Sequence, residues 1–336
     1  MTDTNISSEP PHGVGARRKP KHLPTLPLSA FTPPNSSTSE SFPIVHSPTS
    51  SHPTAVIDTN LGSKANLDQW RASIGKLSPR NINGVVLSLP ADASPDTLED
   101  IKQQYPLMKI LSVITPVDLN QGPLTEAPRF GQTRVTLFIQ FTRSSPKLIE
   151  GIRWALENGY VVDIDIQSSI EGSEGLEELL TAVYKSGETL FVPPAGAGII
   201  LSNFLPPPHD LDISLVKFFN HPDYLIYQNN VATLSLFSSV YVKYIPPQWV
   251  LAKQSEDTKD KSEWKRKVKL FLGPVIEAFG FQRIMFGSST SNPTPGVYDT
   301  PNEWYECARE SLAELGVDQE SLDAVFETAA KSVYGS

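Results

Sequence analysis

Short apolar runs recur along the chain, and stretches with helical periodicity separate them. The eight runs are residues 55–60, 84–90, 109–115, 134–141, 161–166, 189–194, 231–237 and 283–287. Helices are expected at 67–74, 95–104, 146–158, 175–186, 212–219, 262–279, 301–315 and 321–333, and a loop at 116–133. Repeated strand–helix units predict an α/β protein with a parallel sheet. Eight such strands over about 250 residues favour a (β/α)8 TIM barrel over an open doubly wound sheet.

The first 53 residues have a different composition. They contain ten of the thirty prolines, many Ser and Thr residues and almost no apolar periodicity. Such a segment buries too little apolar surface to offset its ordering entropy, so we expect a disordered tail at 1–53 and a barrel with C-terminal helices at 54–336. The cluster Arg17-Arg18-Lys19-Pro20-Lys21 is either a nuclear address or anionic-surface contact, or simply part of a solvated tail.

Composition excludes several classes of protein. The net charge of -9 argues against general nucleic-acid binding, which needs clustered Lys and Arg. A single cysteine, Cys307, rules out an intrachain disulfide and a Cys-type zinc site. No apolar run approaches the roughly 20 residues of a membrane span, and no secretory core is present. We therefore expect a cytoplasmic protein, nuclear if Arg17-Arg18-Lys19 acts as an address.

Residues 279–289 carry the most specific local pattern, FGFQRIMFGSS. Gly280 is typical of a helix stop, and the apolar residues that follow predict a short buried strand ending in a polar loop. This segment resembles the last barrel strand of the amidohydrolase-related branch of the amidohydrolase superfamily, in which FG-x-x-R-I/L-hydrophobic-F-G-S-D closes the barrel. The resemblance covers roughly residues 54–336 and implies a TIM barrel of metal-dependent hydrolase type.

The same resemblance implies a metal centre, but its ligand positions are changed in this chain. The first-strand motif Asp-x-His-x-His corresponds to Asp58-Thr59-Asn60-Leu61-Gly62, so Asn60 and Gly62 replace the histidines. Pro194 stands at the family's sixth-strand His, and Ser289 at its eighth-strand Asp. We therefore predict no metal and no cofactor, with a divalent ion such as zinc expected only if other ligands take over.

The histidines do not restore such a site. Four of the six lie in the predicted tail, namely His12, His22, His46 and His52. His209 and His221 fall in the region after the sixth run, in contexts typical of loops or helix caps, although a two-histidine site there is left open. Without a histidine at a strand end, no Ser-His-Asp set is assignable.

Polar residues at the ends of the runs define the predicted site. In 161–166, alternation points Asp163 and Asp165 into the barrel, where an unpaired carboxylate would have a raised pKa. A simpler interpretation is a buried Asp bonded to backbone or Arg. The same reasoning places further polar residues at the barrel mouth: Asp58, Asn60, Ser88, Gln140, Ser235 and Ser289.

Three hypotheses follow. The first is a pseudoenzyme or small-molecule binder that uses Asn60, Ser88, Gln140, Ser235 and Ser289. The second is an active hydrolase or lyase, lactonase-like or decarboxylase-like, with no metal or an atypical one, and with Asp165 or Asp58 as acid or base. The third is a scaffold role of the tail. The expected partner is a small molecule, not nucleic acid or a membrane. A homodimer and a protein partner of the tail are left open.

Overall fold

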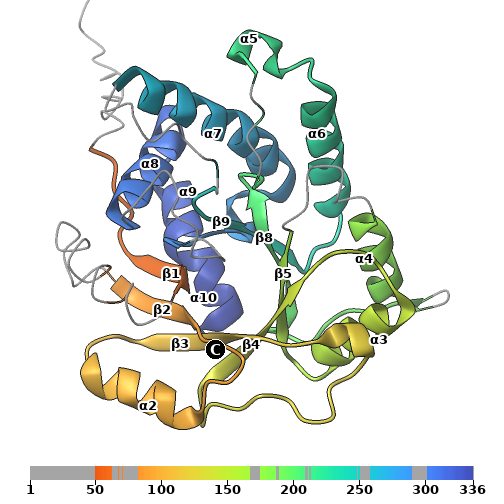
Figure 1. Cartoon of the computed structure of the whole chain (residues 1–336). Helices are drawn as coiled ribbons and strands as arrows, with labels where there is room; N and C mark the ends of the chain where they lie inside the picture. Colours follow the sequence, from red (N-terminus) through yellow and green to blue (C-terminus); the bar gives the residue numbers. More distant parts are fainter. Residues whose placement is uncertain are drawn as a thin grey trace, which may run out of the picture. The chain divides into compact units, whose positions relative to one another are not determined.

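Eight parallel strands form one sheet that curls into a (β/α)8 TIM barrel (Figure 1). The computed structural model describes residues 50–62, 67, 70, 82–166, 175–186, 189–208, 211, 213–247, 249, 258–289 and 301–335. The barrel strands, in sheet order, are β1 (Val56–Leu61), β2 (Ile82–Ser88), β3 (Ile110–Pro116), β4 (Arg134–Gln140), β5 (Val161–Asp165), β8 (Gly198–Leu205), β9 (Val240–Tyr244) and β10 (Ile284–Phe286). The predicted fold class is confirmed.

Helices surround this sheet, most of them on its outer face, and the last one covers an end of the barrel. They are α2 (Pro95–Gln104), α3 (Pro146–Glu157), α4 (Leu176–Tyr184), α5 (Leu215–Phe218), α6 (Pro222–Leu234), α7 (Thr258–Phe279), α8 (Pro301–Glu314), α9 (Gln319–Asp323) and α10 (Ala329–Tyr334), and a π-helical turn, Ala324–Thr328, joins the last two. The predicted starts of α2 and α3 are confirmed. Each begins with a serine whose hydroxyl accepts a backbone N–H, followed by proline in the first turn.

Two predicted strands are wrong. Within 189–194, only Thr189–Leu190 is extended, and it pairs with Lys185–Ser186 in a small hairpin, β6–β7. The sixth barrel strand is β8, where the apolar run is longer. Residues 231–237 belong largely to α6, because a His221 cap and Pro222 start a helix whose buried Val231 and Leu234 have helical spacing. The seventh strand is therefore β9.

Side-chain alternation separates two apolar layers. In β5, Val162 and Ile164 face outward into the large core shared with α3 and α4. Val161 faces inward and packs with Ile57, Val86, Ile200 and Met285 from the other strands, among others. Asp163 and Asp165 lie on the inward face of β5, as alternation predicts.

The last helix closes one end of the barrel. Ala329, Ala330, Val333 and Tyr334 of α10 pack against the inward-facing residues. Arg134, the first residue of β4, donates to the backbone oxygen of Val333 at 3.0 Å. Arg134 and Val161 are the first residues of β4 and β5, so α10 covers the end of the barrel at which the strands begin. The opposite end, where the strands finish, is the mouth of the barrel.

The barrel closes between β10 and β1 through a few specific hydrogen bonds. Ser289 N donates to Asn60 O at 3.1 Å, and Thr59 Oγ1 donates to Phe286 O at 2.8 Å. Gly287 permits this approach. A Cβ atom there would lie 2.9 Å from Asn60 Cβ and 2.9 Å from Ile245 Cγ2. The glycine of the FGSS pattern is therefore needed for β10 and β1 to approach closely enough to close the barrel.

Residues just before β1 are held by the C-terminal helices. Arg309 Nη1 donates to Ser51 O at 2.7 Å, and Gln319 Nε2 donates to His52 O at 2.9 Å. Thr54 bonds the Asp323 carboxylate through its N–H and its hydroxyl. These contacts, which we call the clasp, place Ser51 and His52 on the folded unit. The rest of the predicted tail, 1–49 with Arg17-Arg18-Lys19, lies outside the described residues.

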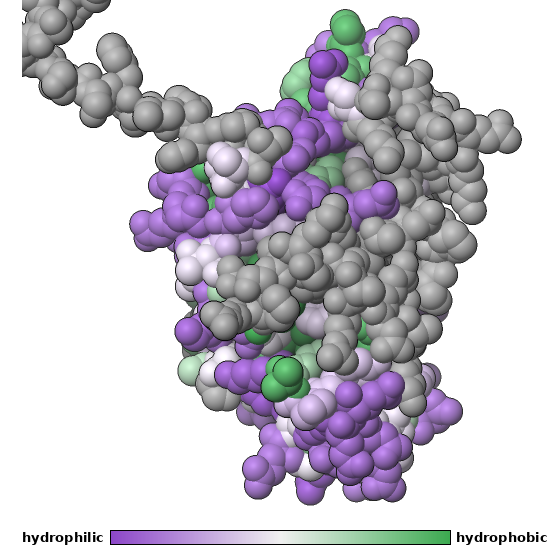
Figure 2. Space-filling view, turned by 90° about the vertical axis from the view of Figure 1, so that its left-hand side faces the viewer, coloured by the Kyte–Doolittle hydropathy of each residue, from purple (hydrophilic) through white to green (hydrophobic). Residues whose placement is uncertain are grey.

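One side of the molecule shows the distribution of hydropathy among the coloured residues (Figure 2). Hydrophilic residues predominate there, and hydrophobic ones appear in small separate patches (Figure 2). Among the described residues, no helix combines the length and apolarity needed to cross a membrane.

Candidate functional site

A pocket of about 530 Å³ opens at the carboxyl ends of β1 to β4. Its polar lining comes from Asn60, Ser88, Asp118, Asn120, Gln140 and Thr142, and its apolar lining from Ile114, Pro116, Val117 and Phe138. Three of the predicted ligand-binding residues, Asn60, Ser88 and Gln140, therefore lie together on one pocket. We call it the mouth pocket.

Most polar side chains of the mouth pocket are not engaged by the protein. Within the described part of the chain, no hydrogen bond occupies the side chains of Ser88, Asn120, Gln140 and Thr142. Asp118 differs, because its carboxylate accepts from Asn120 N at 3.0 Å. Hydroxyl and amide groups both donate and accept, so this lining matches a ligand that does the same.

A different arrangement lies deeper in the barrel. Lys243 of β9 donates through Nζ to Asp163 Oδ2 of β5 at 2.5 Å, and both side chains are almost fully buried, at 0% and 1% exposure. Ser202 Oγ of β8 donates to Asp163 Oδ1 at 2.6 Å. Lys243 Nζ also lies 3.4 Å from Asn60 Oδ1. We call these four residues, Asn60, Asp163, Ser202 and Lys243, the interior cluster.

Asn60 joins the interior cluster to the mouth pocket. Its Oδ1 accepts from Lys243, and its Nδ2 donates to Ser289 O at 2.6 Å. Tyr334 of α10 lies on the other side of the cluster. Burial raises the pKa of the Tyr334 phenol well above its usual value, and the nearby Asp163 carboxylate raises it further. Polar groups thus continue from the floor of the barrel to its mouth.

Asp58, a predicted acid or base, is engaged by protein donors. Its Oδ1 accepts from Asn60 N at 3.1 Å and Ser288 N at 2.9 Å, while Oδ2 accepts from Trp70 Nε1 at 2.9 Å and from the Ser288 hydroxyl. Burial raises the pKa of the Asp58 carboxyl, and the bonds from Ser288, Asn60 and Trp70 oppose that rise. The residue ties β1 to the loop after β10, and it does not line the mouth pocket.

Asp165, the other predicted acid or base, lies at the carboxyl end of β5 and is fully buried. Its Oδ1 accepts a hydrogen bond from Asn203 Nδ2. Asn203 has φ 57°, a left-handed conformation that Asn tolerates better than most residues. Asp165 is paired in register with Gln140, which lines the mouth pocket. It therefore lies beside the pocket without lining it.

The remaining predicted residues have other places. Ser289 contacts Asn60 through its backbone at the barrel closure. Ser235 ends α6 and precedes β9, so it lies at the amino-terminal end of the barrel, and the prediction that it reaches the mouth is wrong. His221 caps α6, accepting from Asp223 N, as its context predicts. His209 lies outside the described residues.

Sequence reasoning missed Lys243 because the seventh strand was assigned to 231–237. The signal was present in the pattern Val240-Tyr241-Val242-Lys243-Tyr244, where a lysine alternates with valines on a strand. In β9, Val240 and Val242 face the outer core. Alternation therefore turns Lys243 inward.

The donor set of the interior does not fit the metal centre that the family resemblance implies. Among the described residues, no three His, Cys, Asp or Glu side chains are grouped to hold a metal ion. Asp58 accepts four protein hydrogen bonds, and Asp163 is neutralised by Lys243. A divalent ion would have to displace these partners.

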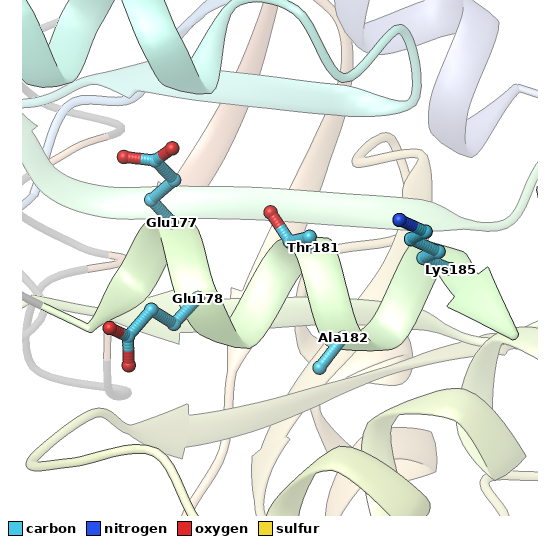
Figure 3. Close-up of a pocket in the computed structure, with 5 residues that line it drawn as sticks. All are labelled: Glu177, Glu178, Thr181, Ala182 and Lys185. Atoms are coloured by element: carbon cyan, nitrogen blue, oxygen red, sulfur yellow. The ribbon is translucent and has the colours of Figure 1, made fainter. Parts of the chain in front are cut away.

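A second depression, of about 490 Å³, lies on the outer surface of α4 (Figure 3). Glu177, Glu178, Thr181 and Ala182 line it, together with Lys185 just after the helix. The described residues that line it all come from one short segment, 177–185, and none belongs to a barrel strand. The depression is far less enclosed by side chains of different elements than the mouth pocket, which remains the candidate site.

Comparison with solved structures supports the fold. An amidohydrolase from Burkholderia multivorans with bound zinc is 16% identical over 84% of this chain and 99% of its own, with a TM-score of 0.54. Amidohydrolase 2 from Bifidobacterium longum subsp. infantis is 14% identical over 84% and 98%, with a TM-score of 0.54. A probable 2-pyrone-4,6-dicarboxylic acid hydrolase from Acinetobacter baumannii, with citric acid bound, is 13% identical over 84% and 99%, with a TM-score of 0.52.

At these identities the likeness concerns the fold. It confirms the TIM-barrel fold that the resemblance drawn from FGFQRIMFGSS implies. The sequence matches no family model, and no curated protein matches it.

Proposed function

We propose that this barrel is a small-molecule binding protein, a pseudoenzyme of amidohydrolase type that works without a divalent metal centre. The observation that carries the proposal is the mouth pocket, in which unengaged hydroxyl and amide groups surround a partly apolar floor. Pockets of this kind, at the carboxyl face of a TIM barrel, are where ligands bind.

The lining suggests the chemistry of the ligand. Ser88, Asn120, Gln140 and Thr142 offer donors and acceptors, and Phe138 and Ile114 offer apolar contact. Among the described residues of the lining, Asp118 is the one with a charged side chain. An uncharged molecule with several hydroxyl, amide or carbonyl groups and one apolar face satisfies these groups best, because an anion would meet the Asp118 carboxylate.

The relatives by fold include proteins with bound zinc and with bound citric acid. For this chain, the changed ligand positions and the occupied carboxylates favour binding without metal. The name amidohydrolase would then describe ancestry.

The proposal is tested by screening uncharged polar compounds for thermal stabilisation of the full chain. A ligand at 100 times its Kd adds about 2.7 kcal/mol to the free energy of unfolding. Titration calorimetry then compares Gln140→Leu with Gln103→Leu, which changes an exposed glutamine of α2 outside the pocket. We expect at least tenfold weaker binding in Gln140→Leu and no change in Gln103→Leu. Equal binding by both variants would place the ligand elsewhere.

One observation favours a second function, a metal-independent hydrolase or lyase that uses Asp165. The Asn203 backbone that presents an amide to Asp165 is in a sparsely populated conformation, and such residues cluster at functional sites. Asp165→Asn keeps an acceptor for Asn203 and removes the charge. If Asp165 acts as acid or base, pH-dependent turnover of esters or lactones disappears in Asp165→Asn and persists in the control Asp100→Asn, which changes an exposed carboxylate of α2 outside the pocket.

A further inference from the structure

The cation in the interior of the barrel belongs to the protein. Lys243 is fully buried, and its ammonium lies between the Asp163 carboxylate and the Asn60 amide oxygen. Asn60 occupies the position at which the resemblance expects the first histidine ligand. The ammonium therefore contacts the group that stands where a metal ligand would be.

The charges of the interior cluster match a monovalent cation. The oxygens around the cation site are two carboxylate oxygens of Asp163, one amide oxygen of Asn60 and one hydroxyl oxygen of Ser202. Without Lys243 these groups carry one negative charge. An ammonium balances that charge, whereas a divalent ion would leave a buried excess of one positive charge. Burial of Asp163 at 1% exposure makes some compensating cation necessary.

The geometry also holds the ammonium in place. Its partners come from β1 and β5, while Ser202 of β8 fixes the other oxygen of Asp163. Four barrel strands thus contribute to one neutral unit. Breaking the ion pair would leave an unpaired charge in a site closed to water.

We infer that Lys243 is a resident cation that takes the place of a divalent metal ion in this barrel. Its amine is covalently part of β9, so the cation cannot exchange or be removed by a chelator. The inference concerns the interior cluster and does not require a ligand in the mouth pocket.

The inference is tested by removing the ammonium and offering a metal in its place. Lys243→Ala leaves Asp163, Asn60 and Ser202 as oxygen donors around a vacated volume, a set that suits a hard cation such as Mn²⁺. Binding is measured by the loss of the free Mn²⁺ electron paramagnetic resonance signal. The matched control is Lys102→Ala, which removes a lysine from a solvent-exposed pair with Glu99.

We expect Lys243→Ala to bind Mn²⁺ at least tenfold more tightly than Lys102→Ala, and Lys243→Ala/Asp163→Asn to lose that gain. A folded Lys243→Ala that binds no better than the control would overturn the inference. Failure of the mouth pocket to bind any ligand would leave this result unaffected, because no ligand is present in the assay.

A measurement on the wild-type protein covers the case in which Lys243→Ala does not fold. Metal content is determined by inductively coupled plasma mass spectrometry on full-length protein purified without chelators and offered zinc and manganese. We expect far less than one equivalent, and no change of thermal stability on adding EDTA. Retention of one equivalent, with loss of stability on chelation, would show that the barrel keeps a metal centre beside Lys243.

Discussion

The interior of the barrel and its mouth both carry polar side chains. Among the described residues, those of the interior bond to one another, whereas most of those at the mouth have no partner in the protein. Asp163, Lys243 and Ser202 form a closed set of contacts across β5, β9 and β8. Ser88 and Gln140, at the ends of β2 and β4, have no such partners within the described residues. Asn60 belongs to both regions.

The difference shows how this fold divides its polar residues between stability and binding. A buried polar group is costly unless it is hydrogen-bonded, so Asp163, Lys243 and Ser202 bond to partners within the protein. An unengaged group at the mouth keeps its water until a ligand replaces it. Substitutions in the interior should therefore change the free energy of unfolding, and substitutions at the mouth should change affinity.

The largest effect is expected from Lys243→Met. Removing the ammonium leaves Asp163 charged and buried, which costs about 3 to 5 kcal/mol of unfolding free energy. Lys102→Met, which breaks an exposed pair, should cost about 1 kcal/mol or less. Urea unfolding monitored by circular dichroism measures both.

A double variant sharpens the same comparison. Lys243→Met/Asp163→Leu removes both charges, and replacing a buried pair by apolar residues is often close to neutral. We expect it to be more stable than Lys243→Met alone. If Lys243→Met has the unfolding free energy of the wild type, the ion pair contributes nothing to stability. Substitutions in the interior would then cost no more stability than substitutions at the mouth.

Asp58→Ala should have the next largest effect. It leaves Trp70 Nε1, Ser288 N and Asn60 N without their acceptor in a buried site, and we expect a loss of roughly 2 to 4 kcal/mol. Asp118→Ala, at an exposed position with one backbone hydrogen bond, serves as control. The same urea titration reports the difference. A loss as small as that of Asp118→Ala would mean that water replaces the carboxylate.

The sequence predicts the fold well where the signals are local. Ser94 and Ser145, each followed by proline, mark the starts of α2 and α3, and the alternation in 161–165 identifies the inward face of β5. It fails where two apolar patterns compete. Val231 and Leu234 fit a short strand as well as a helix, and only the cap at His221 and Pro222 favours the helix.

The site was predictable only in part for the same reason. Asn60, Ser88 and Gln140 lie at or near the carboxyl ends of correctly predicted strands and meet at the mouth pocket. Ser235 was misplaced and Lys243 was missed by one error in the seventh strand. The partners of Asp58 depend on two irregular features, a register shift between β1 and β2 after Asp58 and the loop after β10. The alternation of apolar and polar residues along a strand predicts neither.

Mouth substitutions should barely change stability. Ser88→Ala and Gln140→Ala remove side chains without hydrogen-bond partners in the described structure, and surface changes of this kind usually alter the unfolding free energy by about 0.5 kcal/mol or less. Urea titration of both variants beside the wild type measures this. A loss of stability near that of Asp58→Ala would show that Ser88 and Gln140 stabilise the fold. The proposed division of polar residues between stability and binding would then be wrong.

The smallest effect concerns the clasp and its dependence on pH. His52 stacks on Tyr305, and partial burial, followed by the charge of Arg309, lowers the pKa of its imidazole, while Glu306 opposes this. The unfolded chain therefore takes up the proton first as the pH falls below about 6.5. Stability is lost from that pH downward, until the folded imidazole also becomes protonated.

His52→Phe tests this directly, because it keeps an aromatic ring on Tyr305 and removes the titration. Melting temperatures of the wild type and His52→Phe, measured between pH 7.5 and pH 5, should diverge only below about pH 6.5, with the wild type falling more steeply. The divergence should be slight, since the ring is only partly buried and salt screens its charge. Parallel curves over the whole range would mean that the imidazole meets the same environment in the folded and unfolded chain. In that case the clasp would contribute through its bonds to Ser51, Thr54 and the His52 backbone alone.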